Sequence, residues 1–275
     1  MQSMPVLVAP DAFGAALRAP QVAAAIGRGL ERAGVTPLPE LCPVASGGAG
    51  TIEVLLPALG GETANGFALV EDGATAIVQA AGPSGETGRL VAAAADTGAA
   101  VVVVAAGGGS CDDGGRGAIE AIEQEGGLRG ATLVVLCDAR TAWRDGDTSS
   151  LRRDPRGVAM TGAGGGLAGA LWAQFEARLV AGGPFVLEAL DFDARMRAAR
   201  AVVVGEGRLD RGTMMGRVTG EIATRARQSG VPCHAVVGER AIDRFDARIL
   251  DLQAVLEAPS LEQIEAAGEA LAAFL

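Results

Sequence analysis

The chain has 275 residues, 49% hydrophobic and 20% charged, so it can bury a large core and is too apolar to remain disordered. Its formal net charge of −10 argues against nucleic acid and against an anionic membrane surface as partners. All 23 basic residues are arginine, which excludes any mechanism that needs a lysine ammonium group.

The cysteines and the single histidine limit the chemistry further. The four cysteines show no C-x-x-C spacing and the first residues show no secretory signal, which predicts reduced thiols in a cytoplasmic protein. The apolar run at residues 101–106 is far too short to span a bilayer. His234 cannot form a multi-histidine metal site by itself, and its apolar neighbours favour a structural histidine whose nitrogens are satisfied.

Two helices are predicted near the start of the chain. A strand over residues 6–9 precedes the first helix, which has apolar side chains at i, i+4 and i+8: Val22, Ile26 and Leu30. The second helix covers residues 52–59, after the glycine-rich residues 43–51, and Gly60 ends it. A strand, an acidic or glycine-rich loop and a helix therefore recur from the outset.

Further buried strands are predicted along the rest of the chain. They lie within residues 74–82, 101–106, 133–139, 201–210 and 233–239. Their apolar runs are continuous rather than alternating, so we expect a mostly parallel sheet covered by helices on both faces, and hence an α/β fold. A capping box, Ser260 to Gln263, begins the last helix. Residues 143–157 form the longest polar stretch and predict a mobile surface loop.

Glycines cluster where these strands end. Three loops stand out among the 41 glycines: residues 46–51, 107–115 and 162–166. Glycine lets the backbone approach an anion while the N–H groups of a helix N-terminus face it, so the three loops together favour a phosphate-containing ligand. The Walker A and G-x-S-x-G motifs are absent from the sequence, and no G-x-G-x-x-G motif follows a predicted strand, which disfavours a dinucleotide-dependent dehydrogenase and the common hydrolases.

Acidic residues gather at the same strand ends. They are Asp11, Asp112, Asp113, Asp138, Glu206 and Asp210. Carboxylates beside a phosphate site need a cation between them, so Mg²⁺ is expected. Each aspartate is equally typical of a helix N-cap, and both interpretations stay open. The densest polar segment is residues 206–213, where acidic, basic and hydroxyl side chains share one short turn.

Seven stretches, in this order, resemble the glycerate kinases of bacterial glyoxylate and glucarate metabolism. They are APDAFGA, PVASGGAGT, VQAAG, GGSCDDGG, CDARTAW, GAGGGLAG and GEGRLDRGTMMGR, spread over nearly the whole chain. The resemblance implies two three-layer α/β/α domains. A flavodoxin-like domain would contain residues 1–62 and 192–275, an inserted α/β domain residues 63–191, and the active site would lie in the cleft between them.

The resemblance also implies the chemistry: ATP-dependent, Mg²⁺-assisted phosphorylation of D-glycerate or a related small hydroxy acid to phosphoglycerate. The implied catalytic residues are Asp11, Arg208 and Asp210. The implied phosphate- or nucleotide-binding residues are Gly47, Gly48, Gly108, Gly109, Ser110, Asp113, Gly114 and Gly115. The implied substrate-binding residues are Ser46, Glu206, Thr213 and Arg217, and the implied metal ligand is Asp138.

The sequence departs from the family's pattern at its most polar positions. Gly14 replaces a lysine, Ser46 an aspartate, Ala49 and Gln79 glutamates, and Arg217 a late lysine. The alternative function is therefore a catalytically impaired pseudokinase that binds a small carboxylate or a nucleotide without turnover; a protein that binds neither would keep only the scaffold. The expected partner is a small-molecule substrate, and a homodimer stays open.

Overall fold

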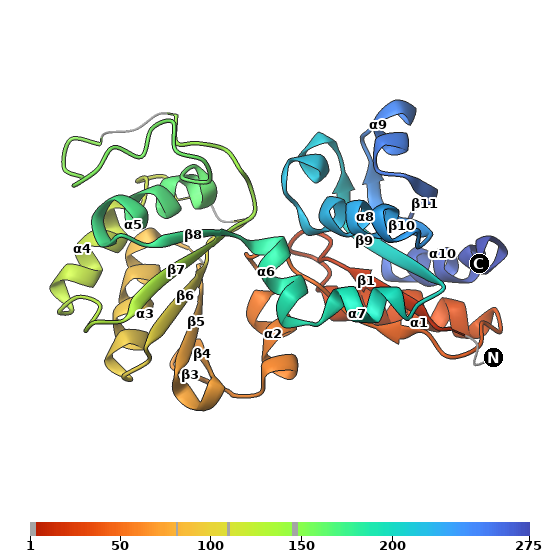
Figure 1. Cartoon of the computed structure of the whole chain (residues 1–275), viewed down its shortest axis with the longest axis horizontal. Coiled ribbons are helices and arrows are strands. Elements are labelled where there is room, and N and C mark those ends of the chain that lie inside the picture. Colours follow the sequence, from red (N-terminus) through yellow and green to blue (C-terminus); the bar gives the residue numbers. More distant parts are fainter. Residues whose placement is uncertain (1–3, 81, 109–110, 145–147) are drawn as a thin grey trace. The chain divides into compact units, whose positions relative to one another are not determined.

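The computed structural model describes residues 4–80, 82–108, 111–144 and 148–275 (Figure 1). The chain forms two compact α/β units, Met1–Ala45 with Leu187–Leu275 and Ser46–Val186, here called unit 1 and unit 2. The α/β class and the presence of two such units confirm the predicted fold class. The domain boundaries at residues 62/63 and 191/192 stay a prediction.

Unit 1 contains a five-stranded parallel sheet. Its order across the sheet is β11 (Leu252–Glu257), β10 (Cys233–Arg240), β9 (Ala201–Leu209), β1 (Val6–Pro10) and β2 (Glu40–Leu41). Numbered by their order along this unit, the strands run 2-1-3-4-5, which is the flavodoxin-like order. In such sheets ligands bind at the carboxyl ends of the strands where the order reverses, here between β1 and β9.

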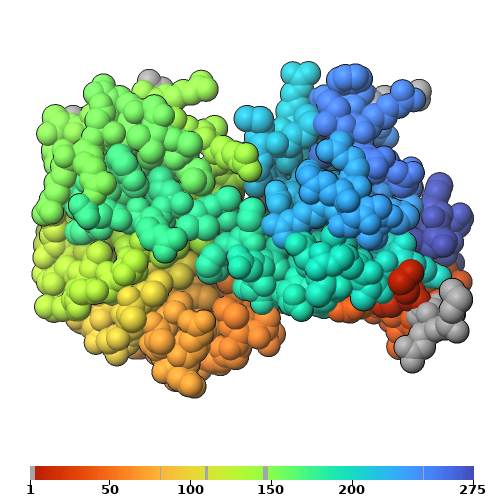
Figure 2. All heavy atoms as spheres, viewed as in Figure 1, coloured from red at the N-terminus to blue at the C-terminus, as the bar shows by residue number. Residues whose placement is uncertain are grey.

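Helices cover both faces of this sheet. On one face α1 (Ala19–Arg32) and α10 (Leu261–Leu271) share a core with alternate residues of β1, β9 and β10. The other face carries α8 (Val218–Ser229), which contacts β9, β10 and α7 (Phe192–Arg197). The outer sides of α7 and α8 face the viewer in Figure 2. A short helix, α9 (Arg244–Ile249), follows β10.

The contact between α1 and α10 depends on glycine. A Cβ atom at Gly29 would lie 2.0 Å from the backbone oxygen of Glu265, whereas one at Gly27 would first meet the side-chain atom Leu41 Cδ2 at 3.0 Å. Gly29→Ala is therefore expected to lower the free energy of unfolding by about 2 kcal/mol, because two backbones must separate. Gly27→Ala, on the same helix, should change it by less than about 0.5 kcal/mol, since a side chain can shift. Urea denaturation of both variants measures this, and equal stabilities would contradict the packing argument.

Unit 2 contains a six-stranded mixed sheet. Its order is β3 (Glu62–Ala64), β4 (Phe67–Val70), β5 (Thr75–Gln79), β6 (Val101–Ala105), β7 (Thr132–Cys137) and β8 (Arg178–Ala181). The last four strands are parallel, and β3 and β4 add an antiparallel hairpin. Three helices pack on one face around a common core: α3 (Ser84–Asp96), α4 (Arg116–Gln124) and α5 (Leu167–Phe175).

The remaining helices of the chain are α2 (Thr51–Leu59), which contacts β4 and β5, and α6 (Gly182–Ala189). Short 3-10 turns are η1 (Glu71–Gly73), η2 (Ala163–Gly166), η3 (Arg211–Met215) and η4 (Ala272–Phe274). Ser260 caps α10 by accepting a hydrogen bond from Gln263 N at 3.3 Å, as the capping box predicts. Within the described part of the chain, no helix is long and apolar enough to cross a membrane.

His234 lies in β10 and is only 2% exposed. Neither ring nitrogen has a hydrogen-bond partner among the described residues, so the prediction that this histidine is satisfied is wrong, although its structural position is as expected. Burial lowers the pKa of the imidazole. The folded state therefore binds fewer protons than the unfolded state below about pH 6.5, and stability falls as the pH drops through that value.

His234→Leu is expected to remove this pH dependence. The wild-type protein should lose about 1 kcal/mol more unfolding free energy between pH 7.5 and pH 5.5 than the variant does. Urea unfolding at the two pH values gives the difference, and identical losses would show that the imidazole is not the titrating group.

Candidate functional site

A pocket of about 520 Å³ lies in unit 1 where the carboxyl ends of β1 and β9 meet. This is the point at which the strand order reverses, so the fold places the pocket where flavodoxin-like sheets bind ligands. Its charged lining residues come from three strands and the segments after them: Asp11, Glu206, Arg208, Arg217 and Glu239. The structure thus brings together four of the six catalytic and substrate-binding residues predicted within unit 1 and adds Glu239.

The loop after β1 holds Asp11 but supplies no cation. The backbone N–H of Asp11 donates to the backbone oxygen of Gly205 at 2.8 Å, and Ala12 N donates to Asp11 Oδ1 at 2.7 Å. These bonds fix the aspartate beside β9. Gly14 has a φ of +61°, and a Cβ atom there would meet nothing within 4 Å. The position at which the family carries lysine therefore faces open space here.

Glu206 is the most deeply buried acid of the pocket, at 5% exposure. Thr213 Oγ1 donates to its Oε1 at 2.7 Å, and Arg217 Nη1 lies 3.4 Å from its Oε2. Burial raises the pKa of Glu206 to about 7, against the opposing effects of Thr213 and Arg217 and with a contribution from Asp11. Glu206 can therefore exchange a proton near neutral pH.

Both arginines of the pocket are held by carboxylates. Arg217 Nη1 lies 3.0 Å from Asp210 Oδ1 and donates to the backbone oxygen of Arg208 at 3.2 Å. Arg208 Nη1 pairs with Glu239 Oε2 at 2.6 Å, and its Nε lies 3.5 Å from Asp210 Oδ2. The guanidinium groups are thus oriented at the pocket before any ligand arrives.

Asp210 also has a structural task. Its Oδ1 accepts a hydrogen bond from Gly212 N at 2.8 Å, which caps η3, and its own N–H donates to Thr213 Oγ1 at 3.2 Å. For Asp210 the N-cap interpretation is therefore correct, and the same carboxylate orients Arg208 and Arg217.

In unit 2, two glycine loops meet at the carboxyl end of β6. Gly107 N donates to the backbone oxygen of Gly47 at 3.0 Å, and Gly108 N donates to Asp138 Oδ2 at 2.7 Å. A Cβ atom at Gly48 would lie 1.8 Å from the backbone oxygen of Gly107. Only glycine allows this approach, so the two loops and Asp138 form one close-packed group.

Two further predicted positions adjoin this group. Gly50 N donates to Gln79 Oε1 at 2.8 Å, so the glutamine that replaces the family's glutamate keeps a hydrogen-bond acceptor at the start of α2. Ser46 directly precedes Gly47, and its backbone oxygen would lie 2.2 Å from a Cβ atom at Gly182. Ser46 belongs to unit 2, whereas the other predicted substrate-binding residues belong to unit 1.

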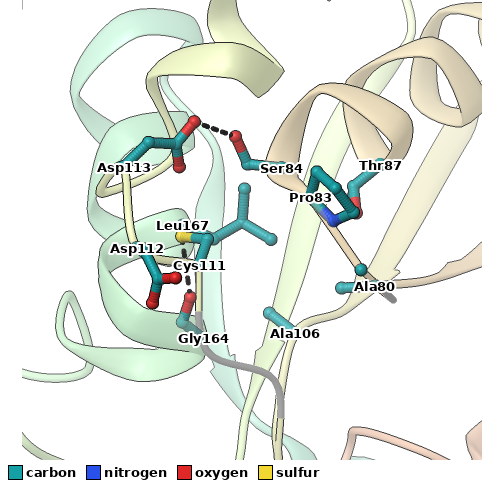
Figure 3. Close-up of a pocket in the computed structure, with 11 residues that line it drawn as sticks. Ala80, Pro83, Ser84, Thr87, Ala106, Cys111, Asp112, Asp113, Gly164 and Leu167 are labelled. Atoms are coloured by element: carbon teal, nitrogen blue, oxygen red, sulfur yellow. Dashed lines mark hydrogen bonds between the residues drawn. The ribbon is translucent and has the colours of Figure 1, made fainter.

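Asp113 joins the starts of α3 and α4. Its Oδ2 accepts a hydrogen bond from Ser84 Oγ at 2.6 Å (Figure 3) and one from Gly117 N at 2.9 Å, and its Oδ1 accepts one from Gly115 N at 3.0 Å. Burial opposes ionisation, but these donors together lower the pKa of Asp113. Gly115 occupies the N-cap position of α4, and the Asp113 carboxylate takes up N–H groups at this helix start that a phosphate would need.

The other predicted residues of the glycine loop at residues 107–115 are Gly109, Ser110, Gly114 and Gly115. Gly114 and Gly115 adopt positive φ values and pack against Trp143 and Ala170. Gly109 and Ser110 lie outside the described residues. Of the polar stretch 143–157, residues 145–147 also lie outside them, and Trp143 is buried rather than exposed.

A magnesium site formed by the protein alone needs several acidic side chains that converge on one point. Among the residues that the structure describes, no three histidine, cysteine or acidic side chains converge as a metal site. A protein-only metal site therefore does not fit. Mg²⁺ in phosphoryl-transfer sites uses one or two carboxylates together with phosphate oxygens and water, and Asp138 beside the glycine loops meets that smaller requirement.

The comparisons with known proteins agree with this architecture. The model of the glycerate kinase family matches residues 6–85 and 127–272, which is more than half of the chain. The chain belongs to the glycerate kinase family. It is 28% identical to a glycerate kinase of Bacillus subtilis (strain 168) over 87% of this chain and 86% of that protein. It is 24% identical to a glycerate 2-kinase of Escherichia coli (strain K12) over 87% and 86%.

The fold of this family member matches a solved structure. A crystal structure assigned to glycerate kinase 2 from Salmonella typhimurium LT2 aligns with a TM-score of 0.75 and 22% identity, over 99% of this chain and 98% of that one. The match supports the two-domain α/β fold.

Two residues, one in the unit 1 pocket and one beside Asp113 in unit 2, were not predicted from the sequence. Glu239, which pairs with Arg208, ends an apolar strand in the same way as Asp11 does, so the same signal could have found it. Ser84 Oγ donates to Asp113 and accepts from Ala118 N at 3.1 Å. Its position at the first turn of α3, after Pro83, is a helix-start signal but does not reveal a partner in α4.

Proposed function

We propose that this protein transfers the γ-phosphoryl group of ATP, with Mg²⁺, to a hydroxyl of D-glycerate or a related small hydroxy acid. The relatives named glycerate kinase support the reaction class. The observation that carries the proposal is the pocket at the β1–β9 strand ends, where three carboxylates and two oriented arginines line one space.

The pocket offers complementary groups for a hydroxy acid. Arg208 and Arg217 present guanidinium groups for the substrate carboxylate, for which arginine geometry is well suited. Asp11 would orient the reacting hydroxyl. Glu206, with its pKa raised to about 7, would accept the hydroxyl proton, since a general base works best when its pKa lies near the operating pH.

The glycine loops of unit 2 offer the complementary groups for the phosphates. Gly47, Gly48, Gly107 and Gly108 bring backbone atoms close together, and Asp138 would be one protein ligand of the metal. Bound Mg-ATP supplies the transferable phosphoryl group and neutralises its charge. The protein's part is to position both reactants and to hold the hydroxyl proton.

The pseudokinase alternative also has a specific observation in its favour. Open space surrounds Gly14, and both pocket arginines are engaged with the protein's own carboxylates. Loss of one transition-state cation typically costs two to three orders of magnitude in rate. The alternative is therefore a protein that binds the same ligands with residual or no turnover.

A coupled ADP-release assay with Mg-ATP and D-glycerate tests the proposal. We expect D-glycerate-dependent ADP release that Arg217→Ala reduces at least tenfold and that Arg248→Ala, a change at an exposed arginine of α9 that does not line the pocket, leaves unchanged. Saturable binding of D-glycerate by calorimetry without ADP release would favour the pseudokinase. Absence of both binding and turnover across several hydroxy acids would overturn both functions.

A further inference from the structure

A second pocket, of about 370 Å³, lies wholly within unit 2, beside Asp113 and the loop that precedes α4. It opens between the ends of β5 and β6, the first turn of α3 and the loop before α4 (Figure 3). Its volume lies in the range typical of small-molecule sites. Four apolar residues form much of its wall: Ala80, Pro83, Ala106 and Leu167.

The charged groups of this pocket are both carboxylates, and the hydroxyl groups of Ser84 and Thr87 line it as well. Asp112 and Asp113 both line it, and none of the described lining residues is basic. Asp112 and Asp113 are both exposed, but Asp113 already accepts three hydrogen bonds, so Asp112 is the carboxylate left to bind a ligand. Two carboxylates repel an anion, so the pocket disfavours phosphate and favours a neutral molecule with hydroxyl or amino donors and an apolar face.

The position of the pocket relates it to the glycine loops. Ala106 lines its wall, and the next two residues, Gly107 and Gly108, are those that meet Gly47 and Asp138. The wall of the pocket at Ala106 is therefore continuous with the loop that is proposed to hold phosphates, and a bound molecule would lie beside that loop. A nucleoside fits these surroundings. Its flat base suits the apolar wall, its ribose diol can donate hydrogen bonds to a carboxylate, and its 5′ position carries the phosphates towards the glycine loops.

We infer that this pocket binds the nucleoside part of the phosphoryl donor, with the base against Ala80, Pro83, Ala106 and Leu167 and a ribose hydroxyl donating to Asp112. The inference rests on the proposed use of a nucleotide. It assigns the nucleoside to Asp112 and the apolar wall, whereas the phosphate or nucleotide contacts implied by the resemblance are at other residues of this loop.

Cys111 provides a direct reporter. It lines the pocket and is partly exposed, whereas Cys42, Cys137 and Cys233 are each at most 2% exposed. Its thiol donates to the backbone oxygen of Gly164 at 3.1 Å (Figure 3), and burial together with Asp113 raises its pKa to about 11. A small maleimide at pH 8.5 to 9 should therefore label Cys111 slowly but ahead of the three buried thiols.

The experiment follows the rate of Cys111 labelling by peptide mass spectrometry in the folded full-length chain. We expect adenosine, which carries no phosphate, and ATP each to slow labelling about tenfold at saturation, whereas tripolyphosphate leaves the rate unchanged. Asp112→Asn should raise the adenosine concentration for half-protection about tenfold, since a hydrogen bond to a charged acceptor is lost. Glu120→Gln, at an exposed acid on α4, is the matched control and should leave it unchanged.

Failure of this inference is distinguishable from failure of the proposed function. If adenosine protects Cys111 from labelling but no ADP is released, the nucleoside pocket is supported and only the proposed kinase reaction is overturned. ADP release without protection of Cys111 by adenosine overturns the pocket assignment and keeps the kinase. Protection by tripolyphosphate equal to that by ATP, or equal half-protection in Asp112→Asn and the wild type, also overturns the assignment.

Discussion

Glu206→Gln is expected to lower turnover with D-glycerate at least a hundredfold at pH 7.5. The substitution keeps the size of the side chain and an oxygen that can accept from Thr213 Oγ1, but it removes the group able to take a proton. General-base catalysis typically contributes two to four orders of magnitude, which sets the expected loss. The ADP-release assay at saturating Mg-ATP measures it.

The pH profile separates a proton acceptor from a merely structural Glu206. With a pKa of about 7, wild-type kcat/KM should rise as the pH increases through 7 and level off above it, because the carboxylate is the active form. The residual activity of Glu206→Gln should lack that rise. Glu269→Gln, at an exposed position of α10, serves as the control and should keep both rate and profile. A Glu206→Gln enzyme with more than a tenth of wild-type turnover would refute the assigned role.

Asp113→Ala is expected to lower the free energy of unfolding of unit 2 by about 3 kcal/mol. The variant loses three hydrogen bonds to a charged acceptor and leaves Ser84 Oγ without its carboxylate partner. The neighbouring Asp112→Ala should change stability by less than about 0.5 kcal/mol, because this substitution removes an exposed side chain that makes none of these three hydrogen bonds. Thermal and urea unfolding of the two variants provide a matched comparison.

The sign of the pH effect gives a second measurement on Asp113. The lowered pKa means that its contribution to stability is present above about pH 4 and is lost as the pH falls below that value. The difference in stability between the wild type and Asp113→Ala should therefore shrink on acidification towards pH 3. A difference that stays constant with pH would contradict a role for the charged carboxylate.

The strands that the sequence predicts are those buried on both faces. Runs such as residues 101–105 have only apolar side chains, so their position in the sheet centre follows from composition alone. The hairpin β3–β4 was not predicted, although its Asn65-Gly66 turn, with positive φ at both residues, is a strong hairpin signal. Its strands are short, and β3 is mostly exposed, so hydrophobic periodicity does not reveal them.

The sequence predicted several residues of the candidate site, but it predicted their individual roles less well. Strand ends identified Asp11 and Glu206 because parallel strands bring their carboxyl ends to one edge. The sequence could not distinguish a ligand-binding acid from one that holds a helix start, and the structure shows that Asp210 caps η3 and that Asp113 binds N–H groups at the start of α4. The raised pKa of Glu206 depends on burial by residues far apart in the chain, which spacing does not record.

The most direct test of the proposed reaction is ³¹P NMR of the purified protein with Mg-ATP and D-glycerate. We expect a phosphomonoester signal of phosphoglycerate that grows as the γ-phosphate signal of ATP declines, and that is absent in Glu206→Gln over the same period. ATP that persists unchanged while D-glycerate binds saturably would contradict the kinase and leave a binding protein with the fold of its family.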